Sequence, residues 1–258
     1  MRADAHSHSE FPELSVVVPA RDEEANLELL YEMVADALDG RVEWELLLVD
    51  DGSRDATSEV IAKLSSRDAR VRGARLARPC GQSAATFAGV DLARAEQIAT
   101  LDGDLQNDPA DLLPLLEAMG DGDAAVGYRL RRRDGFARRI ASRAANAVRN
   151  ALCGDRIRDA GCSLRIVRAE ALRALPRLEG MHRFVPTLLR YQGCRVVELP
   201  VAHHPRLMGR SKYGLRERAL RGFADLLALR WMRSRMLRTS GIQRIGRCGA
   251  CEAWDAGS

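Results

Sequence analysis

Two carboxylates stand one residue apart in Asp102-Gly103-Asp104, directly after the apolar run 98–101. The run is typical of a strand, and side chains two residues apart on a strand point to the same side. Both acids can then bind one hard divalent cation, Mg²⁺ or Mn²⁺, which prefers a few oxygen ligands and also binds phosphate oxygens. The pair therefore predicts a metal site that holds a diphosphate, as an enzyme acting on nucleotide sugars requires.

A second acidic turn, Asp50-Asp51-Gly52-Ser53, follows the apolar run 44–49. Asp51 can accept hydrogen bonds from a nucleobase or a ribose hydroxyl, and Gly52 lets the backbone turn closely beneath a ligand. The same residues also fit an ordinary turn in which Ser53 or Asp55 caps the next helix. From this turn alone, both interpretations stay open.

Short apolar runs alternate with helical stripes along most of the chain. The predicted strands are 14–18, 44–49, 71–76, 98–101, 124–126 and 195–201, and the predicted helices are 23–38, 57–64, 82–93, 109–119 and 184–191. This alternation favours an α/β fold, with a mostly parallel sheet covered by helices on both faces. Ligands of such sheets bind beyond the carboxyl ends of the strands, where both acidic turns are expected.

The chain divides into four segments. Residues 1–12 are an unstructured lead-in, 13–214 one catalytic domain, 215–238 a basic amphipathic helix and 239–258 a loose tail. The helix carries Leu220, Phe223, Leu226, Leu227, Trp231 and Met232 on its apolar side, so it can lie on an anionic bilayer or pack on the body of the protein. No apolar stretch reaches the ~20 residues that span a bilayer, and we expect peripheral contact with a membrane.

The charged residues bear on which molecules the protein binds, and the cysteines bear on its cellular compartment. The 258 residues include 40 basic and 36 acidic side chains, and Arg129, Arg131, Arg132, Arg133, Arg138, Arg139 and Arg143 form one basic cluster. The cluster is either a solvated helix face or a wall that faces phosphate groups, and no motif for nucleic acid recognition is present. The six scattered cysteines and the absence of a secretion signal predict a reduced, cytoplasmic setting. Neither Cys248 and Cys251 nor His203 and His204 are assigned to the metal site.

Three ordered segments, 19–26 (PARDEEAN), 49–57 (VDDGSRDAT) and 101–109 (LDGDLQNDP), resemble family 2 glycosyltransferases of the GT-A fold. Segment 206–214 (RLMGRSKYG), together with DAGCSLR at 159–165 and MHRF at 181–184, is similar to the branch that contains dolichyl-phosphate mannose synthase and bacterial polyprenyl-phosphate glycosyltransferases. The resemblance covers residues 14 to 238. It implies transfer of a hexose from UDP or GDP to a polyprenyl phosphate, with inversion, at the inner face of a membrane.

The resemblance also implies roles for individual residues. Asp102 and Asp104 would bind Mg²⁺ or Mn²⁺, and Pro19, Glu23, Val49, Asp51 and Asp102 would surround the nucleotide. The catalytic set would be Asp104, Gln106, Arg129, Arg206 and Lys212, and the acceptor phosphate would meet Arg138, His182, Arg183 and Ser211. Where family members usually carry an aromatic residue and an Asn, this chain has Arg21 and Asp22, so a guanidinium can stack on the base instead.

Elementary chemistry is consistent with this assignment and defines its alternatives. A lipid monophosphate is already anionic, so it can attack the sugar in line without a strong base, while cations stabilise the leaving diphosphate. A hydroxyl acceptor on a glycan or soluble molecule would instead need a carboxylate base, for which Asp159 is the candidate. A non-catalytic, membrane-associated nucleotide-binding protein is the other alternative. A Rossmann oxidoreductase is excluded, because no Gly-rich turn follows residues 14–18. A homo-oligomer or a membrane-protein partner is left open.

Overall fold

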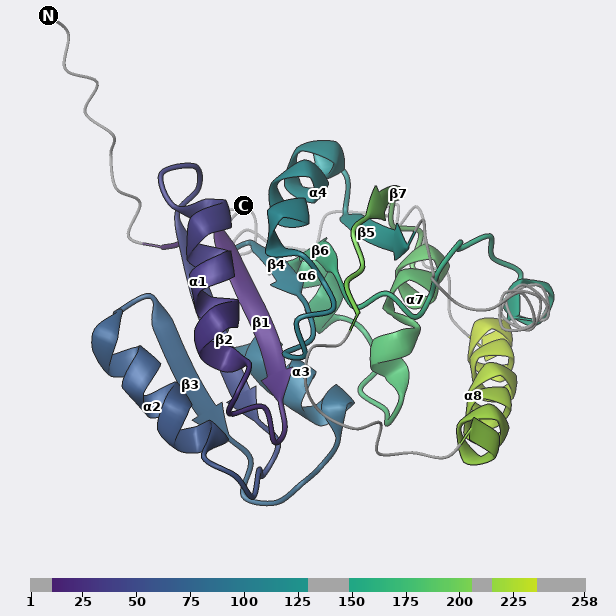
Figure 1. Ribbon diagram of the computed structural model, residues 1–258. Coiled ribbons are helices and arrows are strands. Elements are labelled where there is room, and N and C mark those ends of the chain that lie inside the picture. Colours follow the sequence, from purple (N-terminus) through teal and green to yellow (C-terminus); the bar gives the residue numbers. More distant parts are fainter. Residues whose placement is uncertain (1–10, 130–148, 206–214, 236–258) are drawn as a thin grey trace, which may run out of the picture.

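The computed structural model describes residues 11–129, 149–205 and 215–235, with side chains of the last range described from residue 224. A seven-stranded sheet with the order β3-β2-β1-β4-β6-β5-β7 forms the centre of the molecule (Figure 1). Every neighbouring pair is parallel except the two that involve β6. The predicted α/β class with a mostly parallel sheet is confirmed.

The strands are β1 (Leu14–Ala20), β2 (Trp44–Asp50), β3 (Val71–Arg75), β4 (Gln97–Thr100), β5 (Ala124–Arg129), β6 (Arg165–Arg168) and β7 (Val196–Val201). The strands predicted from apolar runs are all present, and β6 was not predicted. β1 continues through Pro19, which lies opposite Val49 of β2. Because β4 already ends opposite Val17, Pro19 has a strand neighbour on one side only, so its missing N–H removes no bond to β4.

Helices cover both faces of the sheet. On one face lie α1 (Leu27–Leu38), α2 (Thr57–Arg67) and α4 (Leu112–Met119), the last preceded by the 3₁₀ turn η1 (Pro109–Asp111). On the other lie α3 (Gln82–Leu92), α6 (Ala169–Arg173), the 3₁₀ turn η2 (Met181–Arg183) and α7 (Val185–Tyr191). Val16 and Val18 of β1 pack into the first layer and Val17 into the second. Burial on both faces explains why β1 is a continuous apolar run instead of an alternating one.

The last helix, α8 (Leu215–Arg235), lies beside the α7 layer (Figure 1). Leu229 is fully buried there, and Leu226 and Met232 pack against the same hydrophobic cluster. Leu227 and Trp231 point outward and are 47% and 64% exposed. Among the side chains described from residue 224 on, apolar residues of α8 therefore lie both on a face that packs on the body and on a face that is open.

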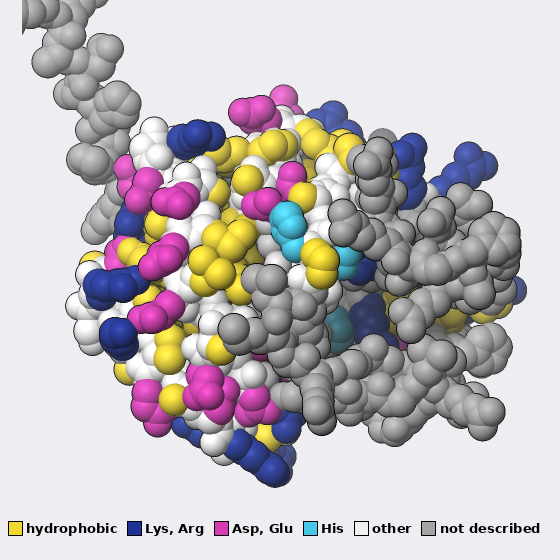
Figure 2. Space-filling model, viewed as in Figure 1, with side chains coloured by type: hydrophobic (Ala, Val, Ile, Leu, Met, Phe, Trp, Pro, Cys, Tyr) yellow, Lys and Arg dark blue, Asp and Glu magenta, His cyan; other side chains and the backbone are white. Residues whose placement is uncertain are grey.

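Charges of both signs are interspersed over the half of the surface formed by α1 and α2 (Figure 2). Lys63 of α2 pairs with Glu28 of α1 at 2.7 Å, and both side chains are largely exposed. Such pairs contribute little to stability because solvent screens them. Within the described residues, no helix has the length and apolar character needed to cross a bilayer.

Candidate nucleotide and metal site

The carboxyl ends of three neighbouring strands meet at one edge of the sheet. Ala20 at the end of β1 lies opposite Asp50 at the end of β2, and Thr100 at the end of β4 lies opposite Val17. β6 runs the other way, so its first residue, Arg165, pairs with Thr100 at the same edge. The antiparallel strand thereby brings the 159–164 segment to the loops that carry the acidic turns.

Asp51 follows β2 and is only 3% exposed. Its Oδ1 accepts backbone N–H groups from Cys80 at 2.6 Å and from Gly81 at 3.0 Å. Gly81 has a φ of +94°, a conformation that favours glycine, and it turns the chain into α3 with these N–H groups directed at the carboxylate. The Nη1 atom of Arg21 lies 3.8 Å from Oδ2 of Asp51. Asp51 thus fixes the 80–81 loop and lies beside a guanidinium that can stack on a base.

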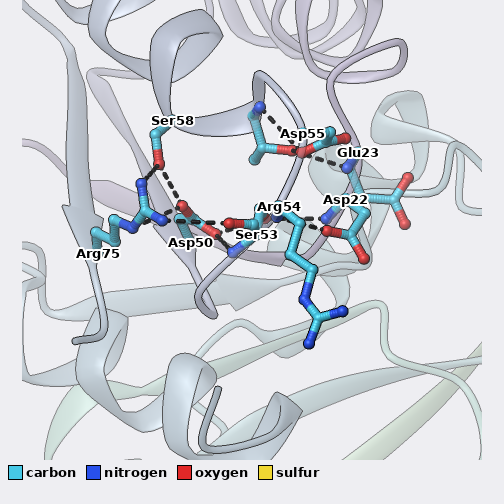
Figure 3. Close-up of polar contacts among 9 residues, drawn as sticks. Asp22, Glu23, Asp50, Ser53, Arg54, Asp55, Ser58 and Arg75 are labelled. Atoms are coloured by element: carbon cyan, nitrogen blue, oxygen red, sulfur yellow. Dashed lines mark hydrogen bonds and ion pairs between the residues drawn. The ribbon is translucent and has the colours of Figure 1, made fainter. Parts of the chain in front are cut away.

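The turn that contains Asp51 also serves a structural purpose. Gly52 has a φ of +66°, and a Cβ there would lie 2.9 Å from the Pro79 ring, so a side chain has no room. The Asp50 carboxylate accepts hydrogen bonds from Ser53 and Ser58 and pairs with Arg75 at 3.5 Å (Figure 3). Both interpretations of the acidic turn are therefore compatible: Asp50 and its neighbours build the turn, and Asp51 is left facing the 80–81 loop.

Hydrogen bonds join the loop after β1 to the loop after β2 (Figure 3). The Asp22 N–H donates to Ser53 Oγ at 2.9 Å, and the Arg54 N–H donates to Asp22 Oδ1 at 2.9 Å. The Glu23 N–H donates to Thr57 Oγ1 at 2.9 Å. Asp22 has a φ of +53°, a conformation that Asp and Asn tolerate better than most residues. Asp22 therefore helps to set the position of its loop.

The acid pair lies in a turn and not on a strand, because β4 ends at Thr100. Leu105, which follows the pair, is 3% exposed and has a φ of +60°, a costly conformation for a bulky residue. A Cβ added at Gly103 would lie 3.6 Å from the Pro19 carbonyl oxygen and 3.7 Å from Glu23 Cγ. Gly103, between the two acids, thus lies close to Pro19 and Glu23 of the 19–26 segment. The strand argument for the shared side of the two acids was wrong.

Hydrogen bonds fix the side chains of the acid pair. Asp102 Oδ1 accepts from Gln82 Nε2 at 2.6 Å, and Oδ2 accepts from Ser163 Oγ at 2.7 Å. Asp104 is 6% exposed, and its Oδ1 accepts from the Gln106 N–H at 3.2 Å. The following helix starts in a standard way, with Asp108 accepting from the Ala110 N–H at 3.0 Å.

The electrostatics of the acid pair fit a divalent cation. Burial raises the pKa of Asp102, and the nearby charge of Asp104 raises it further, against the hydrogen bond from Ser163. A cation between the carboxylates relieves this repulsion, and Mg²⁺ commonly binds one or two carboxylates together with substrate phosphates. In the described ranges, no group of three or more His, Cys, Asp and Glu is gathered to hold a metal.

Arg129 at the end of β5 forms a two-pronged ion pair with Asp159. Its Nε lies 2.6 Å from Asp159 Oδ2, and its Nη2 lies 2.9 Å from Oδ1. The Gly161 N–H donates to Oδ1 at 3.1 Å. The charge of Arg129, which is close enough to act on Asp102, is therefore balanced by Asp159. Asp159, the candidate base for a hydroxyl acceptor, has both oxygens engaged by a cation.

The charge of Arg165 acts on both Asp102 and His182. His182 Nδ1 is 2.7 Å from Ser83 Oγ, and burial, with the charges of Arg183 and Arg165, lowers the pKa of His182 to about 3. His182 is therefore neutral near pH 7 and brings no positive charge to an acceptor phosphate, so its expected contact with that phosphate stays a prediction. Arg183 is exposed. Arg165 is 3% exposed, and its Nη1 has no hydrogen-bond partner among the described residues.

Three consecutive residues at the start of α3 contact the site. The Gly81 N–H reaches Asp51, the Gln82 side chain reaches Asp102, and the Ser83 hydroxyl reaches His182. No local pattern in the sequence points to these residues, because their partners are 20 to 99 positions away along the chain.

The remaining assigned residues are placed as follows. Val49 is fully buried, and its Cγ2 would lie 3.2 Å from a Cβ at Gly89 of α3. Its side chain therefore supports the core and cannot contact a nucleotide, which corrects that assignment. The Gln106 carbonyl accepts the His204 N–H at 2.9 Å, so the loop after β7 joins the acid turn. Arg138, Arg206, Ser211 and Lys212 lie outside the described residues.

Comparisons with known proteins agree with this architecture. Residues 15–175 match the family model described as glycosyl transferase family 2. The chain is 42% identical to dodecaprenyl-phosphate galacturonate synthase of Rhizobium johnstonii over 224 residues, which are 84% of this chain and 66% of that protein. It is 37% identical to undecaprenyl-phosphate 4-deoxy-4-formamido-L-arabinose transferase of Edwardsiella ictaluri over 205 residues, which are 78% of this chain and 63% of that protein. The chain thus spans slightly less than two thirds of the length of these relatives.

Solved structures share the fold. Glucosyl-3-phosphoglycerate synthase from Mycobacterium tuberculosis, in complex with Mn²⁺, UDP and phosphoglyceric acid, has a TM-score of 0.63 at 20% identity and covers 88% of this chain and 80% of its own. A mannosyltransferase from Pyrobaculum calidifontis, in complex with GDP-mannose and Mn²⁺, has a TM-score of 0.61 at 18% identity. The match covers 88% of this chain and 65% of the mannosyltransferase. With the family model and two relatives above 30% identity in agreement, the chain belongs to glycosyl transferase family 2.

Proposed function

We propose that this protein transfers a hexose from a UDP- or GDP-linked donor to a polyprenyl phosphate, with inversion at the anomeric carbon. The observation that carries the proposal is the acid pair Asp102 and Asp104, which lies at the carboxyl edge of the sheet against the first motif. Ligands of parallel sheets bind at this edge. Both relatives are named as a transferase or synthase for a polyprenyl-phosphate sugar, which supports the acceptor class.

The donor nucleotide would lie between the loops that follow β1 and β2. Arg21, whose Nη1 lies 3.8 Å from Asp51 Oδ2, would stack on the base, and Asp51 would accept a hydrogen bond from a hydroxyl or an imide beside the 80–81 loop. Pro19 and Glu23 lie close to Gly103 of the acid turn, where a Cβ would be 3.6 Å from the Pro19 carbonyl oxygen and 3.7 Å from Glu23 Cγ. Asp102 and Asp104 would hold Mg²⁺ or Mn²⁺, which when bound supplies the positive charge that stabilises the departing diphosphate.

A phosphate acceptor suits the state of Asp159 better than a hydroxyl acceptor does. Both oxygens of Asp159 accept hydrogen bonds from the Arg129 guanidinium. A carboxylate held in such an ion pair is poorly suited to take a proton from a hydroxyl acceptor. An anionic phosphate needs no such base, because it attacks with its own charge. In-line attack gives a β-linked lipid phosphate sugar from an α-linked donor. Arg183, Arg206 and Lys212 remain the proposed contacts for acceptor and phosphate groups.

The open face of α8 would bring the protein to a membrane surface. Leu227 and Trp231 are exposed there, and Arg230 and Arg235 are exposed on the same helix. Exposed apolar side chains with neighbouring arginines favour the interface of an anionic bilayer, where Trp is also preferred. A peripheral position at the inner face of the membrane, and any oligomer or membrane-protein partner, stay predictions.

The acceptor class can be tested with two matched lipids. Release of nucleoside diphosphate would be followed over a panel of UDP- and GDP-sugars, with undecaprenyl phosphate or undecaprenol as the acceptor and Mn²⁺ present throughout. We expect turnover with the phosphate and none with the alcohol, and an inverted product by NMR of the anomeric proton. Transfer to the alcohol, or a retained configuration, would contradict the proposal.

A further inference from the structure

Both oxygens of Asp102 are held by side chains from distant parts of the chain. Gln82 Nε2, at the start of α3, donates to Oδ1 at 2.6 Å. Ser163 Oγ, two residues before β6, donates to Oδ2 at 2.7 Å. Each oxygen of the Asp102 carboxylate therefore has one side-chain donor, which restricts rotation of the carboxylate. Neither donor carries a charge.

The orientation of Ser163 is itself set by its neighbours. Its hydroxyl accepts from Asn107 Nδ2 at 2.7 Å, so its single proton is committed to Asp102. Its carbonyl accepts from Thr100 Oγ1 at 2.8 Å and from Arg165 Nε at 3.2 Å. Each of these partners belongs to β4, to the acid turn or to β6, so the position of Ser163 follows from the pairing of these strands.

Neutral donors have a specific advantage beside a metal-binding carboxylate. A guanidinium at the same distance would neutralise the carboxylate and compete with the cation for it. The hydrogen bonds of the two arginines nearby go to other groups: Arg129 pairs with Asp159, and Arg165 Nε donates to Thr100 Oγ1 and to the Ser163 carbonyl. The hydrogen bonds from Gln82 and Ser163 thus restrict the rotation of Asp102 without adding a positive charge that would compete with a cation. Outer hydrogen bonds orient metal ligands in this way.

We propose that Gln82 and Ser163 are positioning residues that hold Asp102 in the orientation in which it binds a divalent cation. This inference rests on the proposed metal role of Asp102 and Asp104. It concerns the affinity of the site for the cation, and it does not depend on which sugar or which acceptor is used.

Binding of Mn²⁺ to the full chain in the presence of saturating UDP would be measured by electron paramagnetic resonance of free Mn²⁺, with no acceptor present. Gln82→Ala and Ser163→Ala should each weaken Mn²⁺ binding about tenfold, since loss of an outer hydrogen bond to a metal ligand costs about 10- to 100-fold. Ser163→Thr, which keeps the hydroxyl, should restore most of the affinity. Ser66→Ala, which removes an exposed hydroxyl bonded only to the Ala62 carbonyl, is the matched control and should change nothing.

Two measurements separate positioning from a loss of structure. Gln82 is exposed, so its truncation should leave the melting temperature unchanged while it weakens Mn²⁺ binding. UDP binding without metal should be equal in all variants. Mn²⁺ affinity within twofold of wild type in Gln82→Ala would overturn the inference, and so would a Gln82→Ala protein that binds UDP alone more weakly. A wild type that binds Mn²⁺ and UDP but transfers no sugar to undecaprenyl phosphate would refute the proposed function and leave this inference standing.

Discussion

Replacement of His182 by Gln should make the stability of the protein less sensitive to acid. In the folded state burial, with the charges of Arg183 and Arg165, lowers the pKa of His182 from 6.5 to about 3. The unfolded chain therefore binds a proton that the folded chain rejects whenever the pH lies between these values. The stability that depends on neutral His182 is complete above pH 6.5 and is lost as the pH falls toward 3.

Linkage gives the size of this effect. Below the unfolded pKa, each pH unit costs about 1.4 kcal/mol, so the full shift would cost about 2 kcal/mol between pH 7.5 and pH 5. Because His182 is only partly buried, solvent screens the shift, and we expect about 1 kcal/mol. Gln can still accept a hydrogen bond from Ser83 but cannot be protonated, so the variant isolates the titration.

The assay is urea unfolding of wild type and His182→Gln at a series of pH values from 7.5 to 5. The free energy of unfolding of the wild type should fall more than that of the variant, with the difference growing below pH 6.5. Equal slopes for the two proteins would show that His182 is not held neutral, and a steeper fall for the variant would reverse the sign of the reasoning.

Three further outcomes test the packing, the ion pair and the open helix face. Gly89→Ala should lower the free energy of unfolding by about 1–3 kcal/mol in urea titration, because its Cβ would lie 2.4 Å from Val17 Cγ1; an unchanged midpoint would contradict the close packing of α3 on β1. Asp159→Asn should cost about 2–3 kcal/mol in the same titration, because it leaves the mostly buried Arg129 guanidinium without its counter-charge; a cost below 0.5 kcal/mol would show that the pair is solvated. Trp231→Ser should reduce co-sedimentation with vesicles that contain anionic lipid about fivefold to tenfold, and equal binding would argue against α8 as the membrane contact.

The sequence was most informative where the signal is local. The apolar runs of β1 and β2 identify strands because both faces of the sheet are covered, and every residue of β2 is buried. The acid pair was found from residue type and spacing alone. β6 was missed because it has only Ile166 and Val167 between two arginines, which is too short a pattern to separate from a loop.

Features set by distant contacts could not be predicted. Val49 ends an apolar run before an acidic turn, and nothing local shows that its side chain packs beneath α3. His182 has a basic residue type, but its neutral state arises mainly from burial, with the charges of Arg183 and Arg165, and of these the sequence shows only the adjacent Arg183. Gln82 and Ser163 acquire their roles only because α3 and the loop before β6 meet at Asp102.

The central claim is that the acid pair holds a cation on which transfer to the lipid phosphate depends. It is tested most directly by nucleoside diphosphate release from the wild type and Asp104→Asn, with undecaprenyl phosphate as acceptor, in EDTA and after addition of Mn²⁺. We expect EDTA to abolish turnover of the wild type and Mn²⁺ to restore it, and we expect Asp104→Asn to stay about 100-fold or more below wild type in Mn²⁺. Turnover that persists in EDTA, or an Asp104→Asn protein as active as wild type, would contradict it.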